Sequence, residues 1–323
     1  MVRHVTSTTG VSRRRVLVLA SLLCLAVAAG CGGGNGGAGS GDDEPSAGGA
    51  DDATGSAASG RVLALGEEPV LADMLALGIR PIASTANVVV DGGFVGLDGV
   101  DVEGIEPLLS TEPNIEHLAS LRPEVVVASE FVVDYLGREV LEGLGSLVVV
   151  PDDPEARVLA LGDAFDRRAE AEALVAELDD AIASGRASLG SLPEASRTVS
   201  VATVYPGPSV AAWVAGPIDI PDTLLALGFT LHPAAGDVTG AEGGRVYLSR
   251  EQVGLLDADT LVAMQSDHVE GEAAAIATMA DDPLWADLPA VAADRVITVD
   301  RLGYPGIAGR IRLVDDLVAL LGS

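Results

Sequence analysis

Short aliphatic runs alternate with helical patterns along the chain from residue 61 to the C-terminus. The runs RVLAL (61–65), SLVVV (146–150), TVSVATVY (198–205) and RVITVD (295–300) are rich in valine, leucine and isoleucine. Such runs, when helical segments separate them, are typical of parallel strands that are covered on both faces. The alternation therefore predicts an α/β fold with mainly parallel sheets.

Residues 154–189 interrupt this alternation, because they contain no strand pattern and are rich in helix-forming residues. Apolar side chains recur there every three or four residues, which predicts one long helix; they are Leu161, Phe165, Ala171, Leu174, Val175, Leu178 and Ile182. The sequence thus predicts two Rossmann-like lobes, 61–153 and 190–323, joined by this helix. A ligand cleft is expected between the lobes.

The first thirty residues have the pattern of an export signal. Arginines 13–15 precede the apolar run VLVLASLLCLAVAA, which is short for a membrane span. The following AAGC resembles the lipobox of bacterial lipoproteins, and SRRRVL fits either a twin-arginine signal or an ordinary basic region. The resemblance implies cleavage before Cys31 and diacylglycerol on its thiol. We expect an exported protein anchored to the outer face of the cell membrane, with residues 31–60 as a flexible tether.

The composition excludes several classes of partner and site. The chain has 19 basic residues, all of them arginine, against 48 acidic residues, and its formal net charge is −29. No basic stripe exists that would suit nucleic acid or an anionic membrane surface. Cys24 would leave with the signal and Cys31 would carry the lipid. The folded part is then left without a thiol for a disulfide or a metal site.

Two stretches share one pattern, PNIEHLASLRPEVVVAS (113–129) and SREQVGLLDADTLVAM (249–264). Each combines a capping residue, a glutamate in the first helical turn, a short helix and an aliphatic strand. An acidic residue in the first turn gains about 0.3–1 kcal/mol from the helix dipole. Helix capping alone can therefore account for Glu116 and Glu251 without any partner.

Four segments in order also resemble a known family. They are RVLALGEEPVLADMLALGIRPIAST, NIEHLASLRPEVVVAS, SREQVGLLDADTLVAM and DDPLWADLPAVAADRVITVD. Behind a lipobox, they resemble the substrate-binding proteins of iron-siderophore and vitamin B12 ABC importers, in which a single long helix joins two lobes. The resemblance covers roughly residues 61–323. It implies a monomeric receptor that binds a metal chelate, with a ferric siderophore expected and haem or cobalamin as alternatives.

The same resemblance gives roles to individual residues. It implies that Glu116 and Glu251 pair with arginines of an ABC permease, and that Trp285 is a packing residue. In open α/β sheets, ligands lie at the carboxyl ends of the strands. Aromatic residues are only 3% of the chain, so those near predicted strand ends are notable. The predicted ligand-binding residues are Phe94, Glu130, Phe131, Tyr205, Trp213, Ser266, Arg301 and Tyr304.

Arg301 is the preferred cationic contact, and a surface salt bridge is its alternative role. The predicted cleft has few arginines and several acidic residues, which favours a neutral or cationic chelate over a strongly anionic one.

Other classes of function are weighed against this interpretation. A receptor for bare Zn²⁺ or Mn²⁺ would use histidine and carboxylate ligands, but His117, His232 and His268 are not part of a histidine-rich loop. No nucleophile elbow, zinc-protease motif, Walker loop or dinucleotide fingerprint is present. We expect no enzyme activity, no resident metal and no cofactor other than the lipid. An anchored interaction protein of the same fold remains an alternative.

Overall fold

The computed structural model describes residues 3–4, 60–110, 113–207, 209–214, 219–241 and 243–322. The predicted signal peptide beyond residues 3–4, the predicted lipidation site Cys31 and residues 31–59 of the predicted tether lie outside the described residues. Within the described ranges, no helix is both long enough and apolar enough to cross a membrane.

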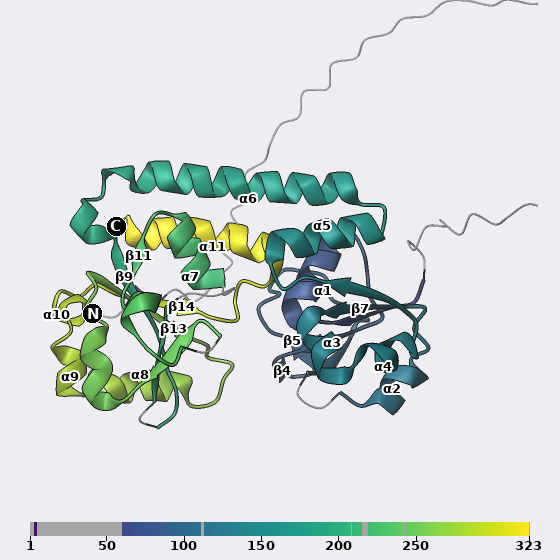
Figure 1. The fold of residues 1–323 in the computed structure, drawn as a ribbon, viewed down its shortest axis with the longest axis horizontal. Coiled ribbons are helices and arrows are strands. Elements are labelled where there is room, and N and C mark those ends of the chain that lie inside the picture. The colour runs from purple at the N-terminus through teal and green to yellow at the C-terminus, as the bar shows by residue number, and fades with distance from the viewer. Residues whose placement is uncertain are drawn as a thin grey trace, which may run out of the picture. The chain divides into compact units, whose positions relative to one another are not determined.

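The N-terminal lobe is built on a five-stranded parallel sheet in the order β6-β3-β2-β7-β8 (Figure 1). Its strands are β2 (Val62–Leu65), β3 (Ala83–Ala86), β6 (Glu106–Leu109), β7 (Val125–Ser129) and β8 (Ser146–Val150). The helices α1 (Glu67–Ala76), α2 (Ile115–Ser120), α3 (Glu130–Leu136) and α4 (Arg138–Glu142) alternate with them, and β4 (Val89–Val90) pairs with β5 (Gly93–Phe94). The parallel arrangement confirms the prediction from the aliphatic runs.

The C-terminal lobe has a seven-stranded sheet in the order β1-β14-β13-β9-β10-β12, and β11 also pairs with β9. Its strands are β9 (Thr198–Val204), β10 (Val210–Trp213), β11 (Thr230–Leu231), β12 (Arg245–Leu248), β13 (Thr260–Gln265) and β14 (Val296–Asp300). Strand β10 is antiparallel to β9 and β12, because only a short turn connects β9 with β10. The helices are α7 (Asp219–Ala226), α8 (Glu272–Ala280), α9 (Pro283–Ala286), α10 (Pro289–Ala292) and α11 (Gly306–Leu321).

The backbone of β1 (Arg3–His4) lies parallel to β14 at the edge of this sheet. We expected the first thirty residues to lie outside the fold. An edge strand presents unpaired backbone groups to which an extended segment can add, which accounts for the pairing.

The helix expected over residues 154–189 is two helices, α5 (Pro154–Ala164) and α6 (Arg168–Ser188). The expected helix is interrupted at Asp166, whose backbone has a left-handed φ of 54°. At the break, a Cβ on Gly162 would come within 2.7 Å of the Ala171 side chain, so the two helices approach closely there. The 21-residue α6 is the long helix of the architecture and packs on both α5 and α11 (Figure 1).

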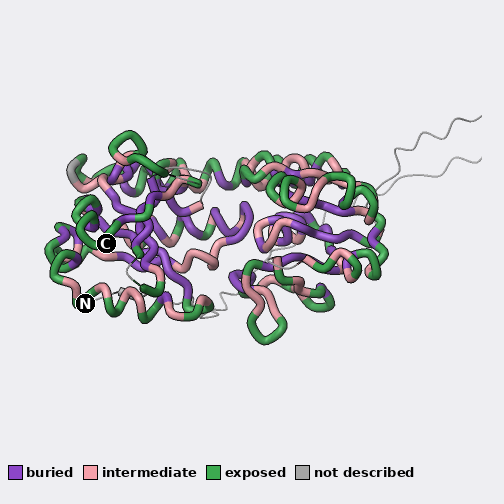
Figure 2. Tube along the Cα trace, turned by 60° about the horizontal axis from the view of Figure 1, so that its bottom comes forward, coloured by how far each residue is buried: buried purple, intermediate pink, exposed green. Residues whose placement is uncertain are grey.

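One hydrophobic core extends through both lobes. It joins Ala64 of β2 and Met74 of α1 to Leu178 of α6, Val201 of β9 and Leu313 of α11. Figure 2 shows the buried residues concentrated along the strands and the inner faces of the helices. A core shared in this way favours a rigid connection between the lobes.

The two repeated stretches differ in local structure. Asn114 caps α2, because its side chain accepts a hydrogen bond from the His117 backbone N–H at 3.1 Å. Ser249 forms a capping box with Gln252, but the segment that follows (Arg250–Leu255) is a 3-10 helix rather than an α-helix. Gly254 interrupts the apolar pattern in this short segment, so little favours a longer α-helix there.

Candidate functional site

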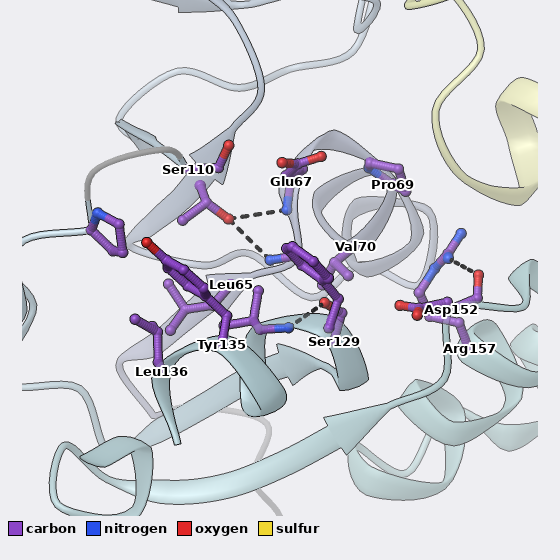
Figure 3. A pocket seen from close by; sticks show the side chains of 15 residues that line it. Leu65, Glu67, Pro69, Val70, Ser110, Ser129, Tyr135, Leu136, Asp152 and Arg157 are labelled. Atoms are coloured by element: carbon purple, nitrogen blue, oxygen red, sulfur yellow. Dashed lines mark hydrogen bonds between the residues drawn. The ribbon is translucent and has the colours of Figure 1, made fainter. Parts of the chain in front are cut away.

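A pocket of about 510 Å³ opens at the carboxyl ends of the N-terminal strands. Its walls come from the segments after β2, β3, β6, β7 and β8, and from helices α1 and α3 (Figure 3). The volume lies within the usual range of small-molecule sites. The position agrees with the rule that ligands bind beyond the carboxyl edge of a parallel sheet.

Helix α3 presents two exposed aromatic rings to this pocket. Phe131 is 67% exposed and Tyr135 is 63% exposed, and both line the pocket. Their ring centroids lie 6.4 Å apart and their planes differ by 1°. Ser129 caps the helix by accepting a hydrogen bond from the Val132 N–H at 3.3 Å. The pair is a flat apolar surface that a ligand could cover.

The loop between β2 and α1 forms another wall of the pocket. Thr85 Oγ1 accepts hydrogen bonds from the backbone N–H groups of Gly66 and Glu67, each at 3.0 Å (Figure 3). Glu67 adopts a left-handed φ of 61°, a conformation that is strained for a residue with a side chain. The neighbouring Glu68 is buried, and this burial raises the pKa of its carboxyl group. The threonine therefore fixes a strained loop at the pocket wall.

A buried ion pair contributes to another wall, because Arg157 itself lines the pocket. The Arg157 Nε donates to Asp73 Oδ2 at 2.6 Å, and its NH1 donates to the Asp152 carbonyl at 2.8 Å. Asp73 is fully buried, and its other oxygen accepts a hydrogen bond from the Ile307 backbone N–H at 2.7 Å. Because Asp73 is on α1 and Ile307 is at the start of α11, this network ties the N-terminal lobe to the C-terminal helix.

Aromatic side chains and an arginine also gather on one face of the C-terminal sheet, from the middle of β9 to its carboxyl end. Tyr205 follows β9, and its ring centroid lies 6.2 Å from that of Tyr247 on β12. The Arg245 guanidinium lies 5.4 Å from the Trp213 ring centroid and 5.5 Å from that of Tyr247. Burial raises the pKa of the Tyr205 phenol. We call Tyr205, Trp213, Arg245 and Tyr247 the arginine–aromatic cluster.

Two predicted contacts are already engaged within the protein. Trp213 is only 6% exposed, and its Nε1 donates to Thr203 Oγ1 at 3.0 Å, so it is a core residue instead of an open cleft wall. Arg301 forms hydrogen bonds with the buried Glu272, the shortest of which is 2.7 Å, so its charge is largely compensated. Arg301 thus forms a salt bridge, as its alternative role required, but with a buried carboxylate and not at the surface.

The remaining predicted ligand residues occupy different surroundings. Phe94 packs against the cluster of Leu71, Leu97 and Ile105, and Glu130 is exposed at the start of α3 without lining the pocket. Ser266 is buried, and its N–H donates to Glu272 at 2.9 Å. Tyr304 donates its hydroxyl proton to Asp316 at 2.7 Å, and burial raises its pKa. Of the eight residues, Phe131 lines the pocket, and Tyr205 and the buried Trp213 belong to the arginine–aromatic cluster.

Sequence reasoning missed Tyr135, Arg245 and Tyr247. Tyr135 lies four residues after Phe131, a spacing that puts both on one helix face. Arg245 and Tyr247 lie two residues apart on a strand and therefore face the same side of the sheet. The two spacings were available in the sequence, but the antiparallel pairing of β12 with β10 was not.

The two first-turn glutamates are exposed to solvent. The Glu251 backbone N–H and the Ser249 hydroxyl group lower the pKa of the Glu251 carboxyl, which keeps it ionised. Trp285 is 4% exposed and packs in the second core of the C-terminal lobe. The burial of Trp285 confirms its predicted packing role.

Two of the described histidines lie beside an acidic side chain. His117 lies 2.8 Å from Glu106, and His232 lies 3.2 Å from Asp257. Among the described residues, no three histidine, cysteine or acidic side chains converge as a metal site would require.

Comparison with known proteins supplies the family. The sequence model of a family described as periplasmic binding protein matches residues 73–301. A search of curated proteins finds no match.

Solved structures with this fold include Staphylococcus aureus SirA in complex with staphyloferrin B, with a TM-score of 0.69 and 19% identity over 81% of this chain and 92% of that one. Bacillus subtilis FeuA in complex with ferri-bacillibactin has a TM-score of 0.68 and 17% identity, covering 82% of this chain and 93% of that one. Vibrio cholerae FhuD bound to Fe³⁺-Desferal has a TM-score of 0.62 and 19% identity over 82% and 98%. At these identities the likeness concerns the fold. Since the family match spans well over half of the sequence, the chain belongs to the periplasmic binding protein family.

Proposed function

We propose that this protein captures a ferric siderophore at the cell surface and delivers it to an ABC permease. The single observation that carries the proposal is the pocket of about 510 Å³ with two exposed, parallel aromatic rings at its wall. A soluble protein rarely exposes such rings without a partner to cover them. Proteins that share the fold are described as siderophore-binding proteins, which favours a chelate as that partner.

The proposed anchor is diacylglycerol on Cys31, and the tether of residues 31–60 would leave the pocket free to meet ligand. Glu116 and Glu251 are the proposed permease contacts. Both are exposed, and charged groups at the rim of an interface chiefly set association rate and register. The connected core and α6 would limit the movement between the lobes to a small hinge rotation.

The aromatic pair provides the test of this proposal. Phe131→Ala and Tyr135→Ala should each weaken binding of the cognate ferric siderophore by about 10–100-fold, as is usual for aromatic residues that dominate an interface. Both side chains are more than half exposed, so the stability of the protein should change little. Leu284→Ala is a matched control, because Leu284 is 41% exposed on α9, outside the pocket.

Isothermal titration calorimetry with ferric hydroxamates, ferric catecholates and ferric citrate would measure the affinities. Unchanged affinity in both aromatic variants would refute the assignment of the pocket. Absence of binding by every ferric siderophore would refute the function.

A further inference from the structure

The arginine–aromatic cluster contains a cation that no acidic side chain pairs with among the described residues. Among the described residues, Arg245 forms no salt bridge, and its guanidinium contacts the faces of the Trp213 and Tyr247 rings. Most other arginines of the described part bond to a carboxylate or a backbone carbonyl group, as Arg301 does with Glu272. Contact with ring faces holds the guanidinium plane and leaves its edge N–H groups free to donate.

The sheet register brings the members of the cluster to one face. Trp213 on β10 pairs with Arg245 on β12, and Ala211 pairs with Tyr247 two positions further along. Alternate residues of a strand point to the same side, so Arg245 and Tyr247 share a face with Trp213. On β9, Thr203 binds the Trp213 indole and is two residues before Tyr205, which completes the face at the carboxyl edge.

The local charge and hydrogen-bonding capacity of this face suit an anion. Three charged groups act on Tyr205, namely Arg245, Arg301 and Glu272, and the last two neutralise each other. Of these three groups, Arg245 is the one without an ionic partner among the described residues. The Tyr205 and Tyr247 hydroxyl groups and the Arg245 N–H groups are hydrogen-bond donors.

We infer that Arg245, Tyr205 and Tyr247 select an anionic chelate by binding its carboxylate or catecholate oxygens. This inference rests on the proposed function and names the charge class of its ligand. It reverses the sequence-based expectation of a neutral or cationic chelate, which counted arginines without knowing which of them are paired. The protein carries a net charge of −29, so an anionic ligand needs such a local cation to bind tightly.

The test compares chelates of different charge and different oxygen chemistry. The probes are ferric citrate, a ferric tris-catecholate and the cationic hydroxamate ferrioxamine, each titrated by calorimetry into the purified protein. Arg245→Gln should weaken binding of the anionic probe by about 10–100-fold, which corresponds to a hydrogen bond to a charged group, and should leave ferrioxamine affinity unchanged. The two anionic probes distinguish a carboxylate from a catecholate ligand.

Two further variants separate a local contact from a general effect. Tyr247→Phe removes one donor from a side chain that is 55% exposed, so it should fold normally and still weaken anionic binding by about tenfold. This variant keeps the inference testable if Arg245→Gln fails to fold. Arg168→Gln makes the same charge change on α6, where Arg168 pairs with Asp163 and Glu172, and should have no effect.

Selective loss of anionic binding in the Arg245 and Tyr247 variants would support the inference. Tight binding of ferrioxamine alone, or anionic binding that neither variant weakens, would overturn it while leaving the proposed function intact. Failure of the wild-type protein to bind any ferric chelate would overturn both.

Discussion

The buried Asp73–Arg157 pair offers the sharpest test of what holds the two lobes together. Asp73 is fully buried and Arg157 is 5% exposed. Asp73→Ala would leave the guanidinium with the Asp152 carbonyl as its remaining hydrogen-bond partner, and the Ile307 N–H without an acceptor. Breaking one side of a buried ion pair costs about 3–5 kcal/mol, because an uncompensated charge stays in the core. We therefore expect the free energy of unfolding to fall by about 3–5 kcal/mol.

Urea denaturation followed by circular dichroism would measure this loss from the shift in midpoint at constant slope. The double variant Asp73→Leu/Arg157→Met removes both charges and leaves one unsatisfied N–H, so it should cost only about 1–3 kcal/mol. If the two sites were independent, their destabilising effects would add, and the double variant would be less stable than Asp73→Ala. A double variant that is more stable than Asp73→Ala would therefore show that the two residues are coupled.

Asp163→Ala is the surface control for this experiment. The Asp163 side chain, which pairs with Arg168, is more than half exposed. Surface pairs of this kind contribute about 0–1 kcal/mol to the free energy of unfolding. The reasoning would be refuted if Asp73→Ala were no more destabilising than this control. It would also be refuted if the double variant were less stable than Asp73→Ala.

Three further predictions follow from local features. Burial raises the pKa of Asp219 to about 6 despite the nearby Arg157 and Arg310. The folded state then holds this proton more tightly than the unfolded state, so the free energy of unfolding should fall as pH rises from about 4 to 6. Asp219→Asn should remove that fall. Its effect on the free energy of unfolding, measured by urea titration, should be about 1–3 kcal/mol more stabilising at pH 7.5 than at pH 4. Equal effects at the two pH values would contradict the prediction. Glu67→Gly should raise the stability by about 0.5–1 kcal/mol, because glycine adopts the φ of 61° without strain. Thermal melts would measure this change, and a loss of stability would show that the strain is absent. Replacing both Glu116 and Glu251 by alanine should abolish siderophore uptake by cells and leave calorimetric affinity unchanged, whereas lost affinity would disprove a docking role.

The sequence pattern was a good guide to the strands and a poorer guide to the helices. Continuous aliphatic runs such as 146–150 and 295–300 correspond to β8 and β14, because a fully buried parallel strand needs apolar residues on both faces. The break at Asp166 has no comparable signal. Its left-handed backbone depends on the close contact between Gly162 and Ala171, which forms only when α5 and α6 pack.

The site could be predicted only in part for a related reason. Phe131 was found because it directly follows a strand end, where ligands bind in parallel sheets. Trp213 was assigned to the cleft by the same rule, but it pairs with Val201 in the middle of β9 and packs with it in the core. Arg301 looked free in the sequence because its partner Glu272 is 29 residues away. Burial and pairing of this kind depend on tertiary contacts.

The most direct test of the account is a calorimetric titration of the purified protein with ferric siderophores, the same siderophores without iron, and free Zn²⁺. The account predicts submicromolar binding of one ferric chelate class and no saturable binding of Zn²⁺. Tight binding of Zn²⁺ alone, or no binding by any ferric chelate, would contradict the claim that this protein is a siderophore receptor.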